Sequence, residues 1–260
     1  MSLNYEHVGI PIAMVLSKSD NKQPRIICLQ DYDGDAKTSF KEIKLDNNNE
    51  YFQSIGDPKQ ERSINYIIGR SGSGKSYYVK QWIQQYYKKL YKKRDVYLFS
   101  LLENDKTLDE LKFIKRILLN DDFASDNEIC VKDFKDSLLI FDDTDCIKDK
   151  KIKLKVDKIL DEVLQVGRHY NISALITRHT ACNSKDTKMI LAESHSYVIF
   201  PNGLGNKAIT YLLDNYLGLD KKQIKKIKGL KSRAITINRT FPMSVVSEKE
   251  CFVIDNNDDD

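Results

Sequence analysis

The stretch from Ile64 to Ser76 constrains this chain more than any other. It consists of the run Ile-Asn-Tyr-Ile-Ile followed by the loop Gly-Arg-Ser-Gly-Ser-Gly-Lys-Ser. Gly69, Gly74 and Lys75-Ser76 fill every fixed position of the pattern Gly-x-x-x-x-Gly-Lys-Ser/Thr, and such loops wrap main-chain N–H groups around phosphate oxygens. The sequence therefore predicts a strand, a phosphate-binding loop and a helix, in that order.

Each end of this loop has an expected chemical role. Lys75 should reach the β- and γ-phosphates of a nucleotide, and the Ser76 hydroxyl should bind Mg²⁺. Gly72 gives the backbone further freedom to turn inward around an anion. ATP and Mg²⁺ are therefore the expected cofactors, and Lys75 is also an expected catalytic residue. The nucleotide-binding residues are predicted to be Gly69, Arg70, Ser71, Gly72, Ser73, Gly74, Lys75 and Ser76.

A second motif follows in Asp-Ser-Leu-Leu-Ile-Phe-Asp-Asp, which ends at Asp142 and Asp143. A buried parallel strand reads as a continuous apolar run, and its carboxyl end opens onto the ligand crevice of a doubly wound sheet. Asp142 is then expected to hold Mg²⁺ through water. Asp143 is expected to orient or deprotonate the water that attacks the γ-phosphate.

Strands and helices are predicted to alternate around these two motifs. Helices are expected over 76–94, 108–119 and 151–167, and strands over 96–99 and 172–176. The strand over 172–176 is expected to lie between the two motif strands, with a polar residue at its end that can touch the γ-phosphate. The fold class is therefore α/β, a P-loop NTPase with a mainly parallel central sheet flanked by helices.

Other parts of the chain suggest additions to this core. Residues 1–57 carry β-rich pieces over 12–16, 25–29 and 40–45, separated by turn-forming clusters, and are predicted to form a β-rich N-terminal extension. The P-loop domain is placed at 58–254, with a strand over 197–200, helices over 207–217 and 221–230, and strands over 232–238 and 250–254. The acidic tail, 255–260, is expected to be disordered.

Charge is informative only where it clusters. The formal net charge is +4 although Lys and Arg total 42, so a nucleic-acid surface would have to come from local arrangement. The densest basic group consists of Lys221, Lys222, Lys225, Lys226, Lys228 and Lys231. Contact with a phosphate backbone and an ordinary solvated helix face both remain open for this group.

The cysteines and the apolar runs bear on the cellular setting. The chain has 5 cysteines, widely spaced and without a Cys-x-x-Cys pair, which argues against a zinc site or a disulfide framework and favours a reducing, intracellular setting. The apolar run over 8–16 lacks the preceding basic residues of a signal peptide and is predicted to be a buried strand. No run approaches the ~18 apolar residues that a membrane helix needs, so no membrane span is expected.

Together with the two motifs, the segment Gly-Arg-His-Tyr-Asn-Ile-Ser at 167–173 resembles the genome-packaging ATPases of large nucleocytoplasmic DNA viruses. This poxvirus-type family belongs to the FtsK–HerA superfamily of DNA-pumping motors, and the resemblance covers about residues 60–200. It implies a homo-oligomeric ring that moves double-stranded DNA into a preformed capsid using ATP. The implied partners are DNA and a capsid or portal-like viral protein, and the implied location is the viral assembly site in the host cytoplasm, with the virion as a second location.

The resemblance also implies roles for two further residues. Arg168 falls where the superfamily places an arginine that reaches a neighbouring subunit's nucleotide. His179 falls at the sensing position, where the superfamily usually has Gln, and can still hydrogen-bond phosphate or water. The catalytic acid is Asp143 rather than the Glu of related ATPases, so the attacking water would take a slightly different position.

Two other function classes remain open at this point. A small-molecule kinase would use the same phosphate loop but needs a lid and an acceptor pocket, and the sequence shows no clear signature of either. A non-hydrolysing, nucleotide-gated assembly protein would bind ATP without turnover. ATP hydrolysis follows from the residues of the two motifs, whereas DNA movement follows from the resemblance.

Overall fold

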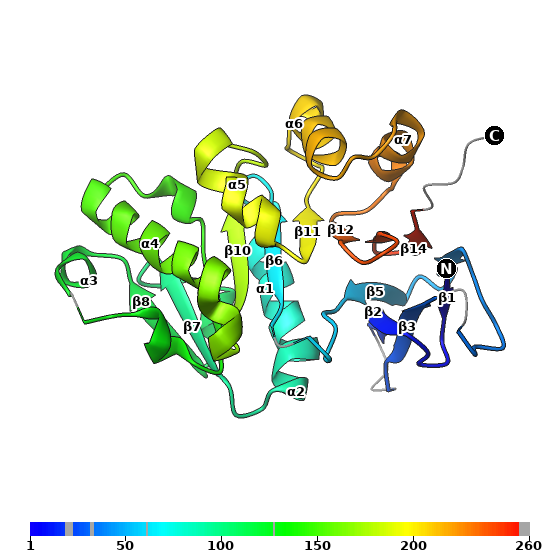
Figure 1. Cartoon of the computed structure of the whole chain (residues 1–260), viewed down its shortest axis with the longest axis horizontal. Coiled ribbons are helices and arrows are strands. Elements are labelled where there is room, and N and C mark those ends of the chain that lie inside the picture. The colour runs from blue at the N-terminus through cyan, green and yellow to red at the C-terminus, as the bar shows by residue number, and fades with distance from the viewer. Residues whose placement is uncertain (19–22, 32–33, 61, 127, 255–260) are drawn as a thin grey trace. The chain divides into compact units, whose positions relative to one another are not determined.

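The computed structural model describes residues 1–18, 23–31, 34–60, 62–126 and 128–254. The chain divides into two compact units, Met1–Gln60 with His195–Asp260, and Glu61–Ser194 (Figure 1). The first segment ends close to residue 57, where the β-rich extension was predicted to end. The assignment of residues 195–254 to the P-loop domain stays a prediction, and the acidic tail lies outside the described residues.

The unit Glu61–Ser194 is built on parallel strands. Its strands are β6 (Ile64–Ile68), β7 (Asp95–Ser100), β8 (Ile114–Leu118), β9 (Ser137–Phe141) and β10 (Ser173–Arg178). They lie in the order β6-β10-β9-β7-β8, and every pair is parallel. All residues of β6, β9 and β10 are buried, as expected for parallel strands covered on both faces. The predicted α/β class is confirmed, as is the position of β10 between the two motif strands.

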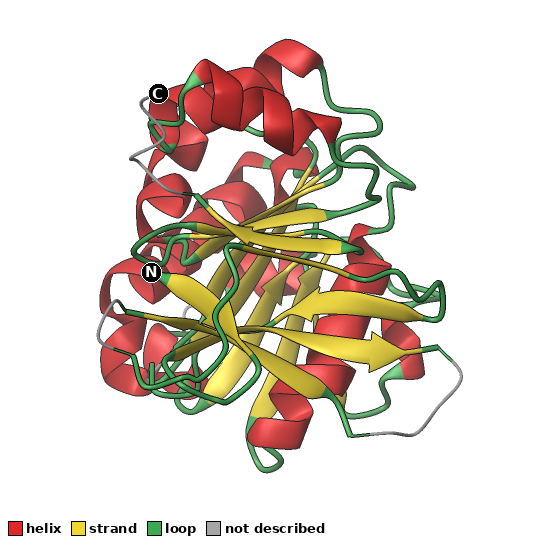
Figure 2. Ribbon diagram, turned by 90° about the vertical axis from the view of Figure 1, so that its right-hand side faces the viewer, coloured by secondary structure: helices red, strands yellow, loops and turns green. Residues whose placement is uncertain are grey.

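Helices and short helical turns connect these strands along the chain, and Figure 2 shows helices in red beside the yellow strands. The helices of this unit are α1 (Lys75–Trp82), a π-helical segment (Ile83–Tyr87), α2 (Lys88–Leu90), α3 (Asp121–Ser125), α4 (Lys150–Val166) and α5 (Ser184–Glu193). Short 3₁₀ turns lie at Leu108–Glu110, Val131–Phe134, Thr144–Cys146 and Gly167–Tyr170. In α4, the Asp149 side chain accepts from the N–H groups of Lys151 and Ile152, which caps the helix start.

The helix predicted over 108–119 is wrong. The structure has a 3₁₀ turn there, followed by strand β8, which pairs with β7 in the register Val96↔Ile114 to Ser100↔Leu118. Apolar residues in a segment this short fit either a helical or an extended period. The extended form prevails because β7 supplies hydrogen-bond partners along the whole of β8, and Lys115 pairs with Asp95 across the two strands at 2.8 Å.

The unit formed by residues 1–60 and 195–260 is antiparallel. One sheet has the order β1 (Ser2–Asn4), β3 (Arg25–Gln30), β2 (Ile10–Ser17), β5 (Glu50–Ser54). A second series pairs β11 (Ser196–Ile199), β12 (Ile235–Asn238), β13 (Ser244–Val246), β14 (Glu250–Val253) and β4 (Glu42–Lys44). One apolar cluster joins Leu3, Ile12 and Phe52 to Val246 and Cys251. The N-terminal strands therefore share their core with the C-terminal ones.

Two helices complete this unit, and both were predicted. They are α6 (Asn206–Tyr211), which continues into a π-helical segment (Leu212–Tyr216), and α7 (Lys221–Gly229). Asp220 accepts from the N–H of Gln223, and the Gln223 side chain accepts from the N–H of Asp220. This reciprocal capping box explains why α7 begins directly after Asp220.

Candidate active site

Both sequence motifs end at the carboxyl edge of the parallel sheet. β6 ends at Ile68 and runs into the phosphate loop, β9 ends at Phe141 and runs into Asp142 and Asp143, and β10 ends at Arg178. Because β10 pairs with both β6 and β9 in parallel, the three strand ends lie side by side. This edge is where open α/β sheets bind their ligands.

The phosphate loop has the backbone that an anion requires. Gly72 has φ 71° and Gly74 has φ 111°, in the left-handed region that glycine adopts without strain. The described residues place no atom within 4 Å of a Cβ built on Gly72. α1 begins after Gly74, and within the described structure no side chain caps its first turn. The N–H groups at the helix start can therefore face a phosphate, and the helix dipole favours negative charge there.

Lys75 is the buried cation of this loop, with 5% of its side chain exposed. Its Nζ donates to the Gly69 carbonyl at 2.9 Å and approaches the Arg70 carbonyl at 3.4 Å. It also lies 3.2 Å from Asp143 Oδ1. The ammonium is therefore held between the loop and the Asp143 carboxylate, where phosphate oxygens can replace its present partners.

Asp142 and Asp143 differ in environment. Asp142 is 9% exposed, and burial together with the neighbouring Asp143 charge raises the pKa of its carboxyl to about 6. A buried carboxylate that is poorly solvated is a suitable oxygen ligand for Mg²⁺. The partly exposed Ser76 hydroxyl at the start of α1 could supply a second oxygen ligand. Asp143, a third exposed and with φ 45°, faces Lys75 instead.

Sequence reasoning missed Thr177, which connects the two acids. Its Oγ1 lies 3.0 Å from Asp142 Oδ1 and 3.1 Å from Asp143 Oδ1, and accepts from the N–H of Asp143 at 2.8 Å. The Thr177 side chain is fully buried. A threonine at the end of an apolar strand that runs beside the acidic strand was the available signal. The single Thr177 hydroxyl proton can be donated to either carboxylate, so Thr177 links the two acids.

His179 lies beside Asp143. Its Nε2 is 3.4 Å from Asp143 Oδ2, and its main-chain N–H donates to Asp145 Oδ2 at 2.9 Å. The structure therefore brings His179 together with Lys75, Asp142 and Asp143. Its predicted sensing role remains a proposal.

Arg168 is not brought to this site within its own subunit. It lies in the exposed 3₁₀ turn Gly167–Tyr170, directly before β10, and therefore at the amino edge of the sheet. The 6 residues of β10 separate it from the carboxyl edge, a distance of roughly 20 Å at the rise of an extended strand. A role for Arg168 at a nucleotide would require the site of another subunit.

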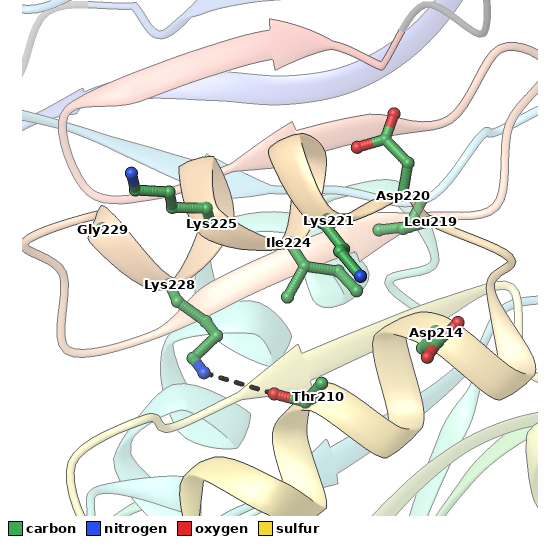
Figure 3. A pocket seen from close by; sticks show the side chains of 9 residues that line it. All are labelled: Thr210, Asp214, Leu219, Asp220, Lys221, Ile224, Lys225, Lys228 and Gly229. Carbon is green, nitrogen blue, oxygen red and sulfur yellow. Dashed lines mark hydrogen bonds between the residues drawn. The ribbon is translucent and has the colours of Figure 1, made fainter.

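Five of the six lysines of the basic group lie on α7, in the other unit, and Lys231 follows the helix. Lys226 pairs with Glu42 at 3.1 Å, and Lys228 donates to Thr210 Oγ1 at 3.2 Å (Figure 3). Lys221, Lys222 and Lys225 are exposed. A groove of about 730 Å³ runs beside them, lined by Thr210, Asp214, Leu219, Asp220, Lys221, Ile224, Lys225, Lys228 and Gly229.

The architecture is similar to that of two solved viral proteins. One is the DNA-packaging ATPase B204 from Sulfolobus Turreted Icosahedral Virus, with a TM-score of 0.51 and 18% identity over 72% of this chain and 98% of that chain. The other is the genome packaging NTPase B204 from Sulfolobus turreted icosahedral virus 2 in complex with AMPPCP, with a TM-score of 0.50 and 16% identity over 72% and 98%. Fold and site together define a P-loop NTPase fold shared with these two viral proteins, and the fold that the resemblance implied is confirmed.

A closer sequence relative gives the family. Uncharacterized protein V3 of Sputnik virophage is 42% identical over 189 residues, which are 72% of this chain and 75% of that protein. The chain belongs to the same family as this viral protein. No family model matches the sequence. Within the described residues, no helix has the length and apolar character needed to cross a membrane.

Proposed function

We propose that this protein is an ATP-hydrolysing motor that translocates double-stranded DNA and packages a viral genome into a capsid. The observation that carries the proposal is the meeting of Lys75, Asp142 and Asp143 at the ends of adjacent parallel strands, with Thr177 between the two acids. The fold shared with a viral protein described as a DNA-packaging ATPase supports the DNA task. The proposal includes a homo-oligomeric ring, a capsid or portal-like partner, and action at the viral assembly site in the host cytoplasm and in the virion.

The residues suggest how the site would act on ATP. The loop N–H groups and the start of α1 would bind the β- and γ-phosphates, and Lys75 would move from Asp143 to the γ-phosphate oxygens. Mg²⁺, which Asp142 and Ser76 would hold, neutralises phosphate charge when bound. Released from Lys75, Asp143 could accept a hydrogen bond from the attacking water and take its proton. Thr177 would keep the Asp143 carboxylate directed at that water.

Thr177→Val is expected to lower kcat for ATP hydrolysis at least about tenfold, with a small change in ATP affinity. The substitution keeps the side-chain shape but removes the hydroxyl that orients Asp143, and it leaves the Asp143 N–H without its partner. We expect it also to lower the free energy of unfolding by about 1–3 kcal/mol. Thr177→Ser is the matched control, because it keeps the hydroxyl. Equal kcat values for the valine and serine variants would argue against a positioning role.

Arg168 is proposed to act on a neighbouring subunit's nucleotide, since the nucleotide site of its own subunit lies at the opposite edge of the sheet. Arg168→Ala subunits and Lys75→Ala subunits should each be inactive alone. Mixed oligomers should recover part of the turnover, because an intact phosphate loop can then face an intact arginine across an interface. Phosphate release by demonstrably mixed oligomers measures this, and an absence of recovery would restrict Arg168 to a structural role.

The exposed lysines of α7 are the surface we propose for the DNA backbone. α7 contains no acidic residue, and the Asp220 carboxylate next to it is engaged in capping the helix. Figure 3 shows Lys221, Lys225 and Lys228 along one groove. Asp214 also lines that groove, and its negative charge disfavours phosphates there. The exposed face of α7 is therefore the more favourable path for the DNA backbone. Each phosphate contact should steepen the salt dependence of DNA binding.

Replacing Lys221, Lys222 and Lys225 together by Gln is therefore expected to weaken double-stranded DNA binding and reduce its salt slope by up to about 3 units. The slope is measured from the DNA dissociation constant at several salt concentrations. Lys89, Lys92 and Lys93, exposed near the end of α2 in the other unit, provide the matched triple-Gln control. If both triple variants lose the same affinity, α7 is not the DNA surface.

A further inference from the structure

Three side chains of types that bind metal ions lie close together next to Asp143. Asp145 and Cys146 lie in the 3₁₀ turn Thr144–Cys146 that follows β9, and His179 follows β10. His179 Nδ1 lies 3.3 Å from Cys146 Sγ and 3.6 Å from Asp145 Oδ1. One ligand atom from each side chain lies within 4.8 Å of the other two. The proposed ATP chemistry does not use Asp145 or Cys146, and it uses His179 only in its proposed sensing role.

The Asp145 carboxylate is held next to the other two ligand atoms of this cluster. Its Oδ2 accepts from the His179 N–H at 2.9 Å, which fixes the plane of the group. Its Oδ1 is buried and makes no hydrogen bond within the described part of the chain. A buried carboxylate oxygen without a hydrogen bond costs free energy, and a cation bound between Asp145 and His179 would satisfy it.

The donor set selects the kind of cation. An imidazole nitrogen, a thiolate and a carboxylate oxygen are the ligands that Zn²⁺ takes, at about 2.0–2.3 Å each. In a tetrahedral site such ligands stand about 3.3–3.8 Å apart, and the observed separations of 3.3 and 3.6 Å agree with this. Mg²⁺ prefers oxygen ligands in an octahedral arrangement, so the thiol disfavours it. Cys146 is exposed, which leaves the fourth position accessible to water.

The second nitrogen of His179 supplies an independent indication. A metal-bound histidine usually donates its other ring N–H to a carboxylate, which fixes the tautomer and raises the basicity of the ligating nitrogen. Here Nε2 lies 3.4 Å from Asp143 Oδ2. A cation on Nδ1 would thus leave Nε2 facing a carboxylate that could serve as its second-shell partner.

We propose that Asp145, Cys146 and His179 form a three-ligand site for Zn²⁺ or a similar thiophilic divalent cation, distinct from the Mg²⁺ site. This inference is independent of ATP hydrolysis and of DNA binding. The absence of Cys-x-x-Cys pairs in the sequence argued against a zinc site. That argument does not cover ligands 33 positions apart in the chain, which the ends of β9 and β10 bring together. A bound cation would hold the His179 imidazole in place beside Asp143, the catalytic acid.

Co²⁺ tests the site because a tetrahedral Co²⁺–thiolate complex has intense visible and near-ultraviolet absorption. The full chain, reduced and in excess Mg²⁺, is expected to take up one equivalent of Co²⁺ with a thiolate charge-transfer band, and Zn²⁺ should displace it. Cys146→Ser should remove this band and weaken Zn²⁺ binding at least about tenfold. Asp145→Asn should weaken Zn²⁺ and Co²⁺ binding by a similar factor while the thiolate band remains at Co²⁺ saturation. Cys130→Ser, at another exposed cysteine of the same unit, should behave as the unmodified chain.

Two results would overturn the inference. One is the absence of a charge-transfer band at Co²⁺ excess. The other is a band that survives in Cys146→Ser, since the thiolate would then come from elsewhere. Thermal unfolding of each variant without metal shows whether it is folded, and Cys146, being exposed, should tolerate serine. Because neither ATP nor DNA is present, failure here would leave the proposed ATPase function unaffected.

Discussion

Lys75→Ala is expected to reduce ATP turnover to background, a loss of at least about 100-fold. The Lys75 ammonium is the cation that the loop holds over the phosphate position, and alanine leaves the γ-phosphate charge without this partner. The structure also shows Lys75 between the Gly69 carbonyl and the Asp143 carboxylate. Its loss therefore removes charge compensation from the acid pair as well. Phosphate release under saturating ATP and Mg²⁺ measures the effect.

The fold of this variant should survive. Lys75 is buried but contacts the loop and Asp143 rather than the apolar core, and alanine is a favourable helix residue at the start of α1. Lys80→Ala is the matched control, because Lys80 lies on the same helix and pairs with Glu110 away from the loop. Circular dichroism should show both variants folded. If Lys75→Ala hydrolyses ATP at the unmodified rate, the loop is not the phosphate site for ATP hydrolysis.

Asp143→Asn is expected to keep ATP binding and lower hydrolysis by about 10²–10⁴-fold. The amide has the same shape and can still interact with Thr177, but it cannot take a proton from water. It also loses the charge that faces Lys75, so Lys75 should bind phosphate without competition, and ATP affinity should be equal or higher. Nucleotide binding and single-turnover hydrolysis measured on one preparation separate these effects.

Asp142→Asn provides the contrast. This carboxylate is the buried one, and its substitution should weaken Mg²⁺-dependent ATP binding while leaving binding without Mg²⁺ little changed. The neutral amide also avoids burying a charge, so the variant should be folded. If the two variants lose ATP binding equally, the division of roles between the two acids is incorrect.

The sequence predicted those parts of the site that are encoded locally. The phosphate loop and the Asp142–Asp143 pair each lie within a few consecutive residues next to an apolar strand, so their pattern alone predicted the strands and the place where the two motifs meet. Thr177 was missed because its importance comes from the pairing of β10 with β9, which places its hydroxyl on two acids about 35 residues earlier. The cluster of Asp145, Cys146 and His179 was missed for the same reason.

The errors and gaps in the fold have a similar origin. Residues 108–119 were assigned as a helix because a short apolar pattern fits both periods, and only the neighbouring β7 decides for a strand. The position of Arg168 at the amino edge of the sheet follows from the direction of β10, which the motif around it does not reveal. In contrast, α4 and α7 were predicted well because long amphipathic periods and capping residues specify them locally.

The central claim is that ATP hydrolysis at this site drives movement along double-stranded DNA. The most direct test is the steady-state ATP hydrolysis rate of the full chain with Mg²⁺, measured with and without double-stranded DNA at saturating ATP. We expect hydrolysis that depends on Lys75 and that double-stranded DNA accelerates several-fold, as for a motor whose cycle is coupled to movement along DNA. ATP binding without hydrolysis, or a rate that double-stranded DNA leaves unchanged, would contradict it.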